Sequence, residues 1–246
     1  SNYEIVIVDN RSEEEETKEY FKRISKKKNI RIIDFNEPFH FGKLYNWAVK
    51  QIDGEYMLML NNDIKVLNDG WLESMLEWCQ LPEVGSVGAK LYYPNGKIQH
   101  AGVIVGAGGA AAHSHRLMDG GDFGYEGAIV NVRNYLAVTG ACVMVKRKLF
   151  LDMGGFDEQF DPAYQDVDFG IRLYERGLYN VYTPYSELIH YESVSRFEDK
   201  GLESDESNAE KLRKKWPQYI ECVGGRDPFY NDNLSYTHED FRIKTE

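Results

Sequence analysis

The chain opens on the apolar run Tyr3-Glu4-Ile5-Val6-Ile7-Val8, and similar runs lie at residues 30–35 and 55–60. The two segments between these runs have helical patterns. Residues 13–28 are acidic at their start and basic at their end, which suits a helix dipole, and residues 42–52 carry apolar side chains at helical spacing. Strands and helices that alternate at this spacing predict an α/β fold with a parallel sheet and right-handed crossovers.

Carboxylates follow two of these runs. Asp9 ends the first run, and the third run continues into Leu60-Asn61-Asn62-Asp63. In parallel sheets of α/β proteins, ligands bind beyond the carboxyl ends of the strands. The sequence therefore predicts a binding site that includes Asp9 and Asp63.

The rest of the chain shows no internal repeat and continues as strands and helices. We expect strands at residues 84–91, 136–145 and 178–183 and helices at residues 70–80, 148–153, 165–176 and 204–216. Pro184 is expected to end the last strand. Glycines punctuate residues 94–135, which predicts hairpins and a long loop, and residues 227–246 have an irregular pattern. The simplest organisation is one domain over residues 1–200 with a C-terminal extension over residues 201–246.

Composition limits the classes of partner. The chain has 29 Lys and Arg against 40 Asp and Glu, a net charge of −11, which argues against nucleic acid because a polyanion needs a basic surface. No apolar run is long enough to predict a membrane-spanning helix. Cys79, Cys142 and Cys222 have neither a CxxC motif nor metal-ligand spacing, so they indicate no disulfide framework and fit a reducing cytoplasm.

Three carboxylates are candidates for chemistry, and each also has a structural explanation. Asp63 has the position of a ligand to a phosphate-bound Mg²⁺ or Mn²⁺, but Asp is also a common turn residue after a strand. Asp166 and Asp168 fall in the first turn of the expected helix at residues 165–176. One of them suits a general base for a substrate hydroxyl. The alternative is that both only complement the positive end of the helix dipole.

Histidines and a lysine add further candidates. His190 is either a metal ligand or a core histidine. Lys43 lies at a helix start, where a cation is unfavourable to the dipole, so contact with a phosphate is favoured. The segment His113-Ser114-His115 does not indicate a metal pair, because residues two apart on a strand point to opposite faces. The glycine cluster at residues 106–109 follows no first strand and opens no helix, so it is not a dinucleotide-binding motif.

Short motifs follow one another along residues 3–196. They are Val8-Asp9-Asn10-Arg11-Ser12, Phe41-Gly42-Lys43-Leu44-Tyr45-Asn46-Trp47-Ala48, Leu60-Asn61-Asn62-Asp63, Thr139-Gly140-Ala141-Cys142, Gly154-Gly155-Phe156-Asp157-Glu158, Gln165-Asp166-Val167-Asp168-Phe169 with Arg172, and His190-Tyr191-Glu192-Ser193-Val194-Ser195-Arg196. Their sequence and order resemble the family 2 glycosyltransferases, which have the GT-A fold. The later segment Asp227-Pro228-Phe229-Tyr230-Asn231-Asp232-Asn233-Leu234-Ser235 resembles the tail of the bacterial polysaccharide, O-antigen-type branch.

The resemblance implies a Rossmann-like, mostly parallel central sheet flanked by helices, and it implies roles for individual residues. Asp166 is implied as the catalytic base. Asp63 and His190 are implied to hold Mg²⁺ or Mn²⁺, and we expect their nearest side-chain atoms to lie about 4–6 Å apart. The implied donor-binding residues are Asp9, Lys43, Asn46, Asn62 and Asn61, which replaces the first Asp of the family motif. The implied acceptor or sugar pocket includes Gly140, Ala141, Gln165 and Asp168.

The implied activity is an inverting, metal-dependent transfer of a sugar from a nucleotide-diphosphate sugar, carrying UDP or dTDP, to a hydroxyl of a glycan or lipid-linked acceptor. We expect it to serve cell-surface polysaccharide synthesis in the cytoplasm, with peripheral association at the inner face of the cell membrane. The first strand of the family is absent here, so the alternative is a truncated, non-catalytic module for assembly or glycan binding. A nucleotidyltransferase is disfavoured, because no Gly-rich phosphate loop with a basic residue follows the first strand.

Overall fold

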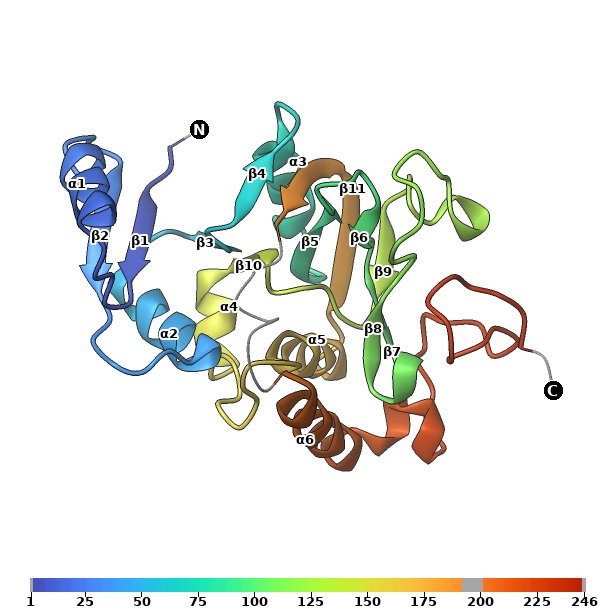
Figure 1. Ribbon diagram of the computed structural model, residues 1–246. Helices are drawn as coiled ribbons and strands as arrows, with labels where there is room; N and C mark the ends of the chain where they lie inside the picture. The colour runs from blue at the N-terminus through green and yellow to red at the C-terminus, as the bar shows by residue number, and fades with distance from the viewer. Residues whose placement is uncertain (1, 192–200, 245–246) are drawn as a thin grey trace.

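The computed structural model describes residues 2–191 and 201–244, and their fold is of the α/β class (Figure 1). Its centre is a seven-stranded mixed sheet. The strands along its main path are, in spatial order, β3 (Tyr56–Leu60), β10 (Cys142–Lys146), β5 (Val84–Tyr92), β11 (Tyr179–His190) and β4 (Ile64–Val66). In addition, β6 (Ile98–His100) pairs with β5, and β9 (Arg133–Tyr135) pairs with β11. The strands β3, β5 and β11 run in one direction, and β10 and β4 run against them.

The helices are α1 (Glu15–Ile24), α2 (Phe41–Ala48), α3 (Trp71–Cys79), α4 (Arg147–Asp152), α5 (Gln165–Glu175) and α6 (Gly201–Lys215). Of these, α3 covers one face of the seven-stranded sheet, and α2, α4 and α5 cover the other. Strand β10 shows the two faces, because its Cys142 and Met144 pack with α3 whereas Val143 and Val145 pack with α2, α4 and α5. This alternation is what a strand buried on both faces requires. Within the described residues, no helix is long and apolar enough to cross a membrane.

The first two strands stand apart from the main sheet. The strands β1 (Ile5–Asp9) and β2 (Ile30–Asp34) pair in parallel, as predicted, but they form a two-stranded sheet of their own. The expectation that β3 continues this sheet is wrong for the described residues, because β3 pairs there only with β10. One edge of β1 and one edge of β3 therefore have no strand partner among those residues. The backbone N–H and C=O groups along such edges can pair with a further strand. The absence of the family's first strand from this sequence stays a prediction.

The last strand runs past Pro184, where the sequence predicted its end. Strand β11 continues to His190, and its register against β5 shifts between Thr183 and Glu187. Proline has no backbone N–H and is tolerated in a sheet at such an irregularity. The added residues, Pro184–His190, carry His190 to a position opposite Ile64 of β4, next to the turn that joins β3 to β4.

The strand expected at residues 136–145 begins only at Cys142. Residues 136–141 form an irregular, buried segment before it.

The first helix is also shorter than its charge pattern indicates, because α1 begins at Glu15 and ends at Ile24. Before the helix, the backbone N–H of Ser12 donates to Asp9 Oδ1 at 3.0 Å, so this carboxylate holds a turn where a helix start was expected.

The C-terminal tail packs on a small hairpin outside the main sheet. This hairpin consists of β7 (Val103–Val105) and β8 (Ala111–His113). Tyr230 and Phe241 of the tail are buried in one cluster with Ile104. Although the tail has few regular elements, as expected, many of its side chains are buried; in Figure 1 it is the red segment beside β7 and β8.

Asp227 anchors the tail to the hairpin. Its carboxylate is 1% exposed and accepts hydrogen bonds from the backbone N–H groups of Val105 (2.9 Å) and Phe229 (2.8 Å). Burial raises the pKa of Asp227 from 3.8 to about 7, and the two backbone hydrogen bonds oppose this rise. The folded protein therefore binds a proton at Asp227 more tightly than the unfolded chain does.

This shift predicts how stability depends on pH. The raised pKa of Asp227 contributes stability that is fully present below about pH 4 and is lost as pH rises to about 7. Asp227→Asn removes this contribution, because the amide stays neutral, and it loses one acceptor for a backbone N–H, at about 1–3 kcal/mol. We expect the melting temperature of the variant to lie below that of the wild type at pH 5, and the difference to shrink by pH 8.

Thermal unfolding at pH 5, 6, 7 and 8 measures this effect. Asp232→Asn is the matched control, because Asp232 belongs to the same tail and its ion pair with Arg226 is exposed. Its curve is expected to parallel that of the wild type. If the Asp227→Asn curve is parallel as well, Asp227 does not titrate in this range.

Candidate functional site

Strand pairing brings Asp63 and His190 together from distant parts of the sequence. Asp63 lies in the turn between β3 and β4, and His190 ends β11. Because β4 and β11 are antiparallel with His190 opposite Ile64, the backbone N–H of Tyr191 donates to the carbonyl of Asp63 at 2.9 Å. The side chains meet as well, with His190 Nε2 at 3.1 Å from Asp63 Oδ1. They are closer than the 4–6 Å expected from the sequence.

The contacts of this pair fit a cation site. Asp63 Oδ1 is buried and has no hydrogen-bond donor. His190 Nδ1 is bonded to Gln99 Oε1 at 2.7 Å, which leaves Nε2 toward Asp63. Two ligands about 2.1 Å from one octahedral ion, at right angles, lie about 3.0 Å apart, close to the observed separation. The residues that the structure describes contain no group of three His, Cys, Asp or Glu that could hold a metal, so Asp63 and His190 would need further ligands, such as substrate phosphates and water.

A turn before β10 joins this pair to Asp166. Asp166 is the second residue of α5 and is partly exposed, as expected for a residue that opens a helix at a site. Gly140 N–H donates to Asp166 Oδ2 at 2.7 Å, and the next carbonyl, that of Ala141, accepts from the backbone N–H of Asn61 at 2.9 Å. The other carboxylate oxygen of Asp166 accepts from the N–H of Val167 at 2.9 Å. Gly140 and Ala141, which are consecutive in this turn, therefore hold the Asp166 carboxylate and the loop that carries Asp63.

Gly140 allows this close approach. A Cβ at this position would lie 3.3 Å from the Phe41 ring and 3.4 Å from Asp166 Cβ, tighter than most real contacts. Phe41 begins α2, so the N-terminus of α2 and that of α5 both meet the Thr139–Ala141 turn. The structure thus places Gly140 and Ala141 beside Asp166, where the resemblance implied a sugar or acceptor pocket.

Two of the donor-binding candidates, Lys43 and Asn46, lie at a hollow next to α2. This hollow has a volume of about 350 Å³, and Lys43 and Asn46 are among the residues that line it. Phe35, which follows β2, also lines it and donates its backbone N–H to the carbonyl of Asp9 at 2.8 Å. Asp9, Lys43 and Asn46 are therefore neighbours in the fold. Asn62 is exposed in the turn before β4.

Asn46 is occupied by structural contacts. Its Nδ2 donates to the carbonyl of Phe156 (2.9 Å) and to Glu158 Oε1 (3.0 Å), and its Oδ1 accepts from the N–H of Phe156 (2.8 Å). A Cβ at Gly155, which has φ +72°, would lie 2.1 Å from Asn46 Oδ1. Asn46 thus fastens α2 to the loop of residues 154–158, and it borders the hollow without a free donor.

Asp168 does not line a pocket, contrary to the expectation from sequence. Its side chain is 0% exposed. Oδ2 accepts from Arg172 Nε at 2.8 Å, and Oδ1 accepts from Trp216 Nε1 at 2.8 Å and lies 2.6 Å from Lys215 Nζ. Because Lys215 and Trp216 lie at the end of α6, this buried carboxylate joins α5 to the C-terminal extension. Gln165, also expected at the pocket, is 5% exposed and donates to the Pro162 carbonyl at 3.0 Å.

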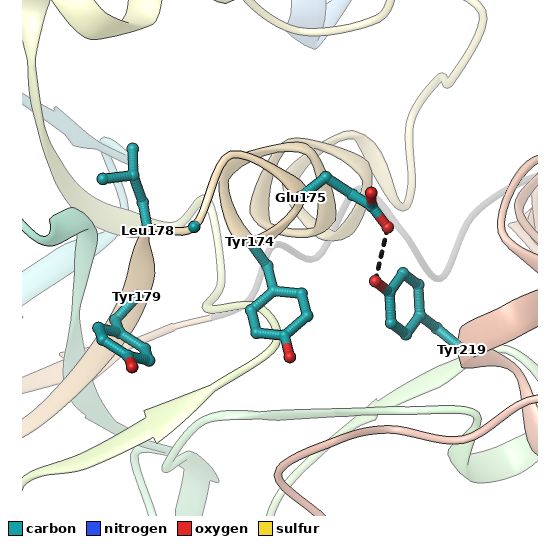
Figure 2. Close-up of a pocket in the computed structure, with 6 residues that line it drawn as sticks. Tyr174, Glu175, Leu178, Tyr179 and Tyr219 are labelled. Atoms are coloured by element: carbon teal, nitrogen blue, oxygen red, sulfur yellow. Dashed lines mark hydrogen bonds between the residues drawn. The ribbon is translucent and has the colours of Figure 1, made fainter.

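A second hollow, of about 400 Å³, lies at the other end of α5 (Figure 2). At 1.5 Å per residue along the helix, Asp166 and Glu175 are separated by roughly 13 Å. Figure 2 shows the rings of Tyr174, Tyr179 and Tyr219 around this hollow, and Glu175 Oε1 accepts from the Tyr219 hydroxyl at 2.6 Å. Glu175 is the one carboxylate among the residues that line this hollow, and none of them is a histidine, so the hollow lacks a pair like Asp63 and His190.

Strand β6 carries two buried polar residues that support the site. Gln99 contacts His190, as described. His100 is its neighbour and was assigned no role from the sequence. Its Nε2 accepts from the N–H of Thr139 at 3.2 Å, and its Nδ1 bonds the Ala89 carbonyl at 2.8 Å. Burial lowers the pKa of His100 to about 3, so it is neutral. The sequence held one signal for these supporting residues. Gln99 and His100 are polar residues between Ile98 and Ala101, and polar side chains that are buried in a strand need hydrogen-bond partners.

The motif around His190 is only partly described. His190 and Tyr191 belong to the described residues, whereas Glu192, Ser193 and Arg196, which contribute to the resemblance, lie outside them.

The chain is similar to known proteins of one family. A family model described as Glycosyl transferase family 2 matches residues 1–153. The uncharacterized protein y4gI of Sinorhizobium fredii and the O-antigen biosynthesis protein RfbC of Myxococcus xanthus are each 38% identical to the chain over 99% of its residues. The chain spans 27% and 19% of their respective lengths. The N-acetylglucosaminyl-diphospho-decaprenol L-rhamnosyltransferase of Mycobacterium tuberculosis is 39% identical over 62 residues, which are 25% of this chain and 20% of that protein.

Solved structures share the fold at low sequence identity. GalNAc-T7, solved with UDP, GalNAc and Mn²⁺, has a TM-score of 0.56 and 12% identity, and the match covers 76% of this chain and 37% of that one. The mannosyltransferase PcManGT of Pyrobaculum calidifontis, solved with GDP-Man and Mn²⁺, has a TM-score of 0.55 and 16% identity, with 78% and 48% covered. The similarity supports the GT-A fold of this chain.

The contacts of Asp168 predict a structural effect of its loss. Asp168→Asn leaves Arg172 and Lys215 without their buried carboxylate, and breaking a buried ion pair costs about 3–5 kcal/mol. We expect the free energy of unfolding, measured in urea, to fall by that amount. Asp152→Asn, which breaks the exposed pair with Lys148, is the control and is expected to cost at most about 1 kcal/mol. Equal small effects would mean that Asp168 does not hold α6.

Proposed function

Because the chain belongs to glycosyltransferase family 2 and has the GT-A fold, we propose that it catalyses an inverting, metal-dependent sugar transfer. The donor is a nucleotide-diphosphate sugar, and the acceptor is a hydroxyl of a glycan or of a lipid-linked glycan. The observation that carries this proposal is the contact of His190 Nε2 with the unbonded Asp63 Oδ1, joined by one turn to Asp166.

The proposed base is Asp166. The N–H groups of Gly140 and Val167 fix its carboxylate, one on each oxygen, and each oxygen keeps a lone pair for a further proton. The acceptor hydroxyl gives its proton to Asp166 while its oxygen bonds to the anomeric carbon, and the bond from that carbon to the diphosphate oxygen breaks on the opposite face. The sugar is therefore transferred with inversion. A positioned base of this kind contributes about 10²–10⁴-fold in rate.

Asp63 and His190 are proposed to hold Mg²⁺ or Mn²⁺, which would neutralise charge on the leaving diphosphate. Asn61 and Asn62 lie in the same loop, and Asn61 contacts His190 through its side-chain amide. The hollow lined by Lys43 and Phe35 is the proposed place for the nucleotide, with the lysine toward phosphate and with Asp9 hydrogen-bonded to Phe35 next to it. We propose UDP or dTDP, which the resemblance to the family implies; of the two solved structures compared above, GalNAc-T7 was solved with UDP and PcManGT with GDP-Man.

The proposed biological setting is cell-surface polysaccharide synthesis. The relative from Myxococcus xanthus is named an O-antigen biosynthesis protein, and the name of the relative from Mycobacterium tuberculosis gives a lipid diphosphate acceptor. A lipid-linked acceptor would bring this protein to the inner face of a membrane by peripheral contact. The buried free thiols of Cys79 and Cys142 fit the reducing conditions of a cytoplasm.

The second candidate is a non-catalytic module for assembly or glycan binding. The edges of β1 and β3 that have no strand partner within residues 2–191 and 201–244 favour it, because a further strand beside them would help to complete this side of the fold. The assembled set of Asp63, His190 and Asp166 disfavours it, since a binding module needs neither a base nor a cation site. Catalytic measurements therefore separate the two candidates.

Asp166→Asn tests the role of the base. We expect hydrolysis or transfer from UDP-glucose, UDP-GalNAc or dTDP-rhamnose, screened with Mn²⁺, to fall by about 10²–10⁴-fold. Binding of UDP, measured by calorimetry, is expected to stay within about threefold, because Asp166 is not a proposed donor contact. Glu175→Gln, at the far end of the same helix, is the control with wild-type turnover. Unchanged turnover in Asp166→Asn would remove this residue from the mechanism.

Asp63→Asn tests the cation site. The amide keeps the shape but removes the charge, so we expect the dissociation constant for Mn²⁺, followed by electron paramagnetic resonance, to rise by at least about tenfold. Asp69→Asn is the control, because Asp69 is an exposed carboxylate after β4. If both variants bind Mn²⁺ like the wild type, the site around Asp63 is not a metal site.

A further inference from the structure

We propose that Gln99 is a positioning residue that holds His190 in the tautomer protonated at Nδ1 and so presents the Nε2 lone pair to the cation beside Asp63. The inference rests on the proposed metal role of His190 and adds a residue that neither the motifs nor the comparisons assign. Gln99 is 1% exposed, so it acts through His190 and not on the substrate.

The contact between Gln99 and His190 decides which ring nitrogen carries the proton. Gln99 Oε1 lies 2.7 Å from His190 Nδ1. An amide oxygen only accepts hydrogen bonds, so Nδ1 must donate. The amide is oriented by its other end, because Gln99 Nε2 lies 3.5 Å from the carbonyl of His190 and donates toward it. If the amide were flipped, Gln99 Oε1 would face the carbonyl of His190, which places two acceptors together. Gln99 Nε2 would then face Nδ1, which places two donors together if Nδ1 carries the proton.

The surroundings of His190 Nε2 agree with this assignment. Asn61 Nδ2, which can only donate, lies 3.4 Å from Nε2. Asp63 Oδ1 faces Nε2 at 3.1 Å and is buried without a hydrogen-bond donor. A neutral His190 protonated at Nδ1 has no proton to offer that oxygen. Its lone pair and the carboxylate point at each other, which is favourable once a cation lies between them.

An irregularity in β6 places Gln99 there. In the pairing of β6 with β5, His100 is opposite Leu91 and Ile98 is opposite Tyr92, so the register shifts at Gln99. Such bulges re-aim a side chain, often beside active sites. The backbone is held as well, because His113 Nδ1 bonds the Gln99 carbonyl at 2.8 Å. Gln99 is therefore fixed before any ligand binds.

Two substitutions at Gln99 separate positioning from packing. Gln99→Leu removes the acceptor for Nδ1–H at similar volume, and Gln99→Glu keeps an acceptor oxygen in place. The control is Asn180→Leu, which removes a buried amide near the start of β11 that bonds Leu136 and Gly170, roughly 30 Å of extended strand from His190. His190→Gln identifies the His190 signals and reports the metal role itself.

The first measurement uses the whole chain without metal. Ring ¹⁵N chemical shifts are recorded at about pH 8, above the ordinary histidine pKa of about 6.5. In the wild type we expect a protonated Nδ1 and an unprotonated Nε2 for His190. Gln99→Leu is expected to give a mixture of tautomers, whereas Gln99→Glu and Asn180→Leu keep the wild-type form. A wild-type His190 protonated at Nε2 overturns the proposal, whether or not any variant folds.

The second measurement is Mn²⁺ binding by electron paramagnetic resonance. Loss of an outer partner of a metal-bound histidine typically costs about 10–100-fold in affinity, so we expect that rise in dissociation constant for Gln99→Leu. Gln99→Glu and Asn180→Leu are expected to stay within about threefold of the wild type. If His190→Gln weakens Mn²⁺ binding and Gln99→Leu does not, Gln99 has no positioning role. If His190→Gln binds Mn²⁺ like the wild type, the proposed metal role of His190 fails instead.

Discussion

The pairing of β11 with its neighbours is the constraint on which the rest of this structure depends. β11 pairs in parallel with β5 and antiparallel with β4 and β9, so a single strand joins most of the main sheet. Its register against β4 sets His190 opposite Ile64 and therefore beside Asp63. A slip of one residue would turn His190 to the other face of the sheet. The bulge near Pro184 lets the strand reach this position.

Buried polar groups hold the elements around this sheet in place. Asp168 joins α5 to α6, Asn46 joins α2 to the loop of residues 154–158, and His100 holds the turn before β10. Each of these groups is bonded, as burial of a polar group requires. Asp63 Oδ1 differs, because it is buried without a donor and faces a histidine nitrogen. Asp161 Oδ1, Gln165 Oε1 and Ser186 Oγ are also buried without a partner, so the 3.1 Å contact with His190 Nε2, and not the missing donor alone, is the physical reason to propose a cation at Asp63.

The contacts of the family-motif residues divide them into two kinds: those that face the candidate site and those that pack inside the protein. In the segment Gln165–Phe169, Asp166 faces the site and Asp168 is buried against Arg172 and α6. Gly155 likewise allows the close approach of Asn46, because a Cβ there would lie 2.1 Å from Asn46 Oδ1. A motif residue that recurs in a family can therefore mark a catalytic contact or a packing contact, and the sequence pattern is the same for both.

The sequence by itself determined the α/β class, most of the helices, the parallel pairing of β1 with β2, and the family, because these depend on local periodicity and short motifs. It also singled out Asp63, Asp166 and His190. Only the tertiary structure decided the partition into two sheets, the extension of β11 past Pro184, the burial of Asp168 and the contact of Gln99 with His190. These depend on strand register and on side chains far apart in the sequence, which no local pattern encodes.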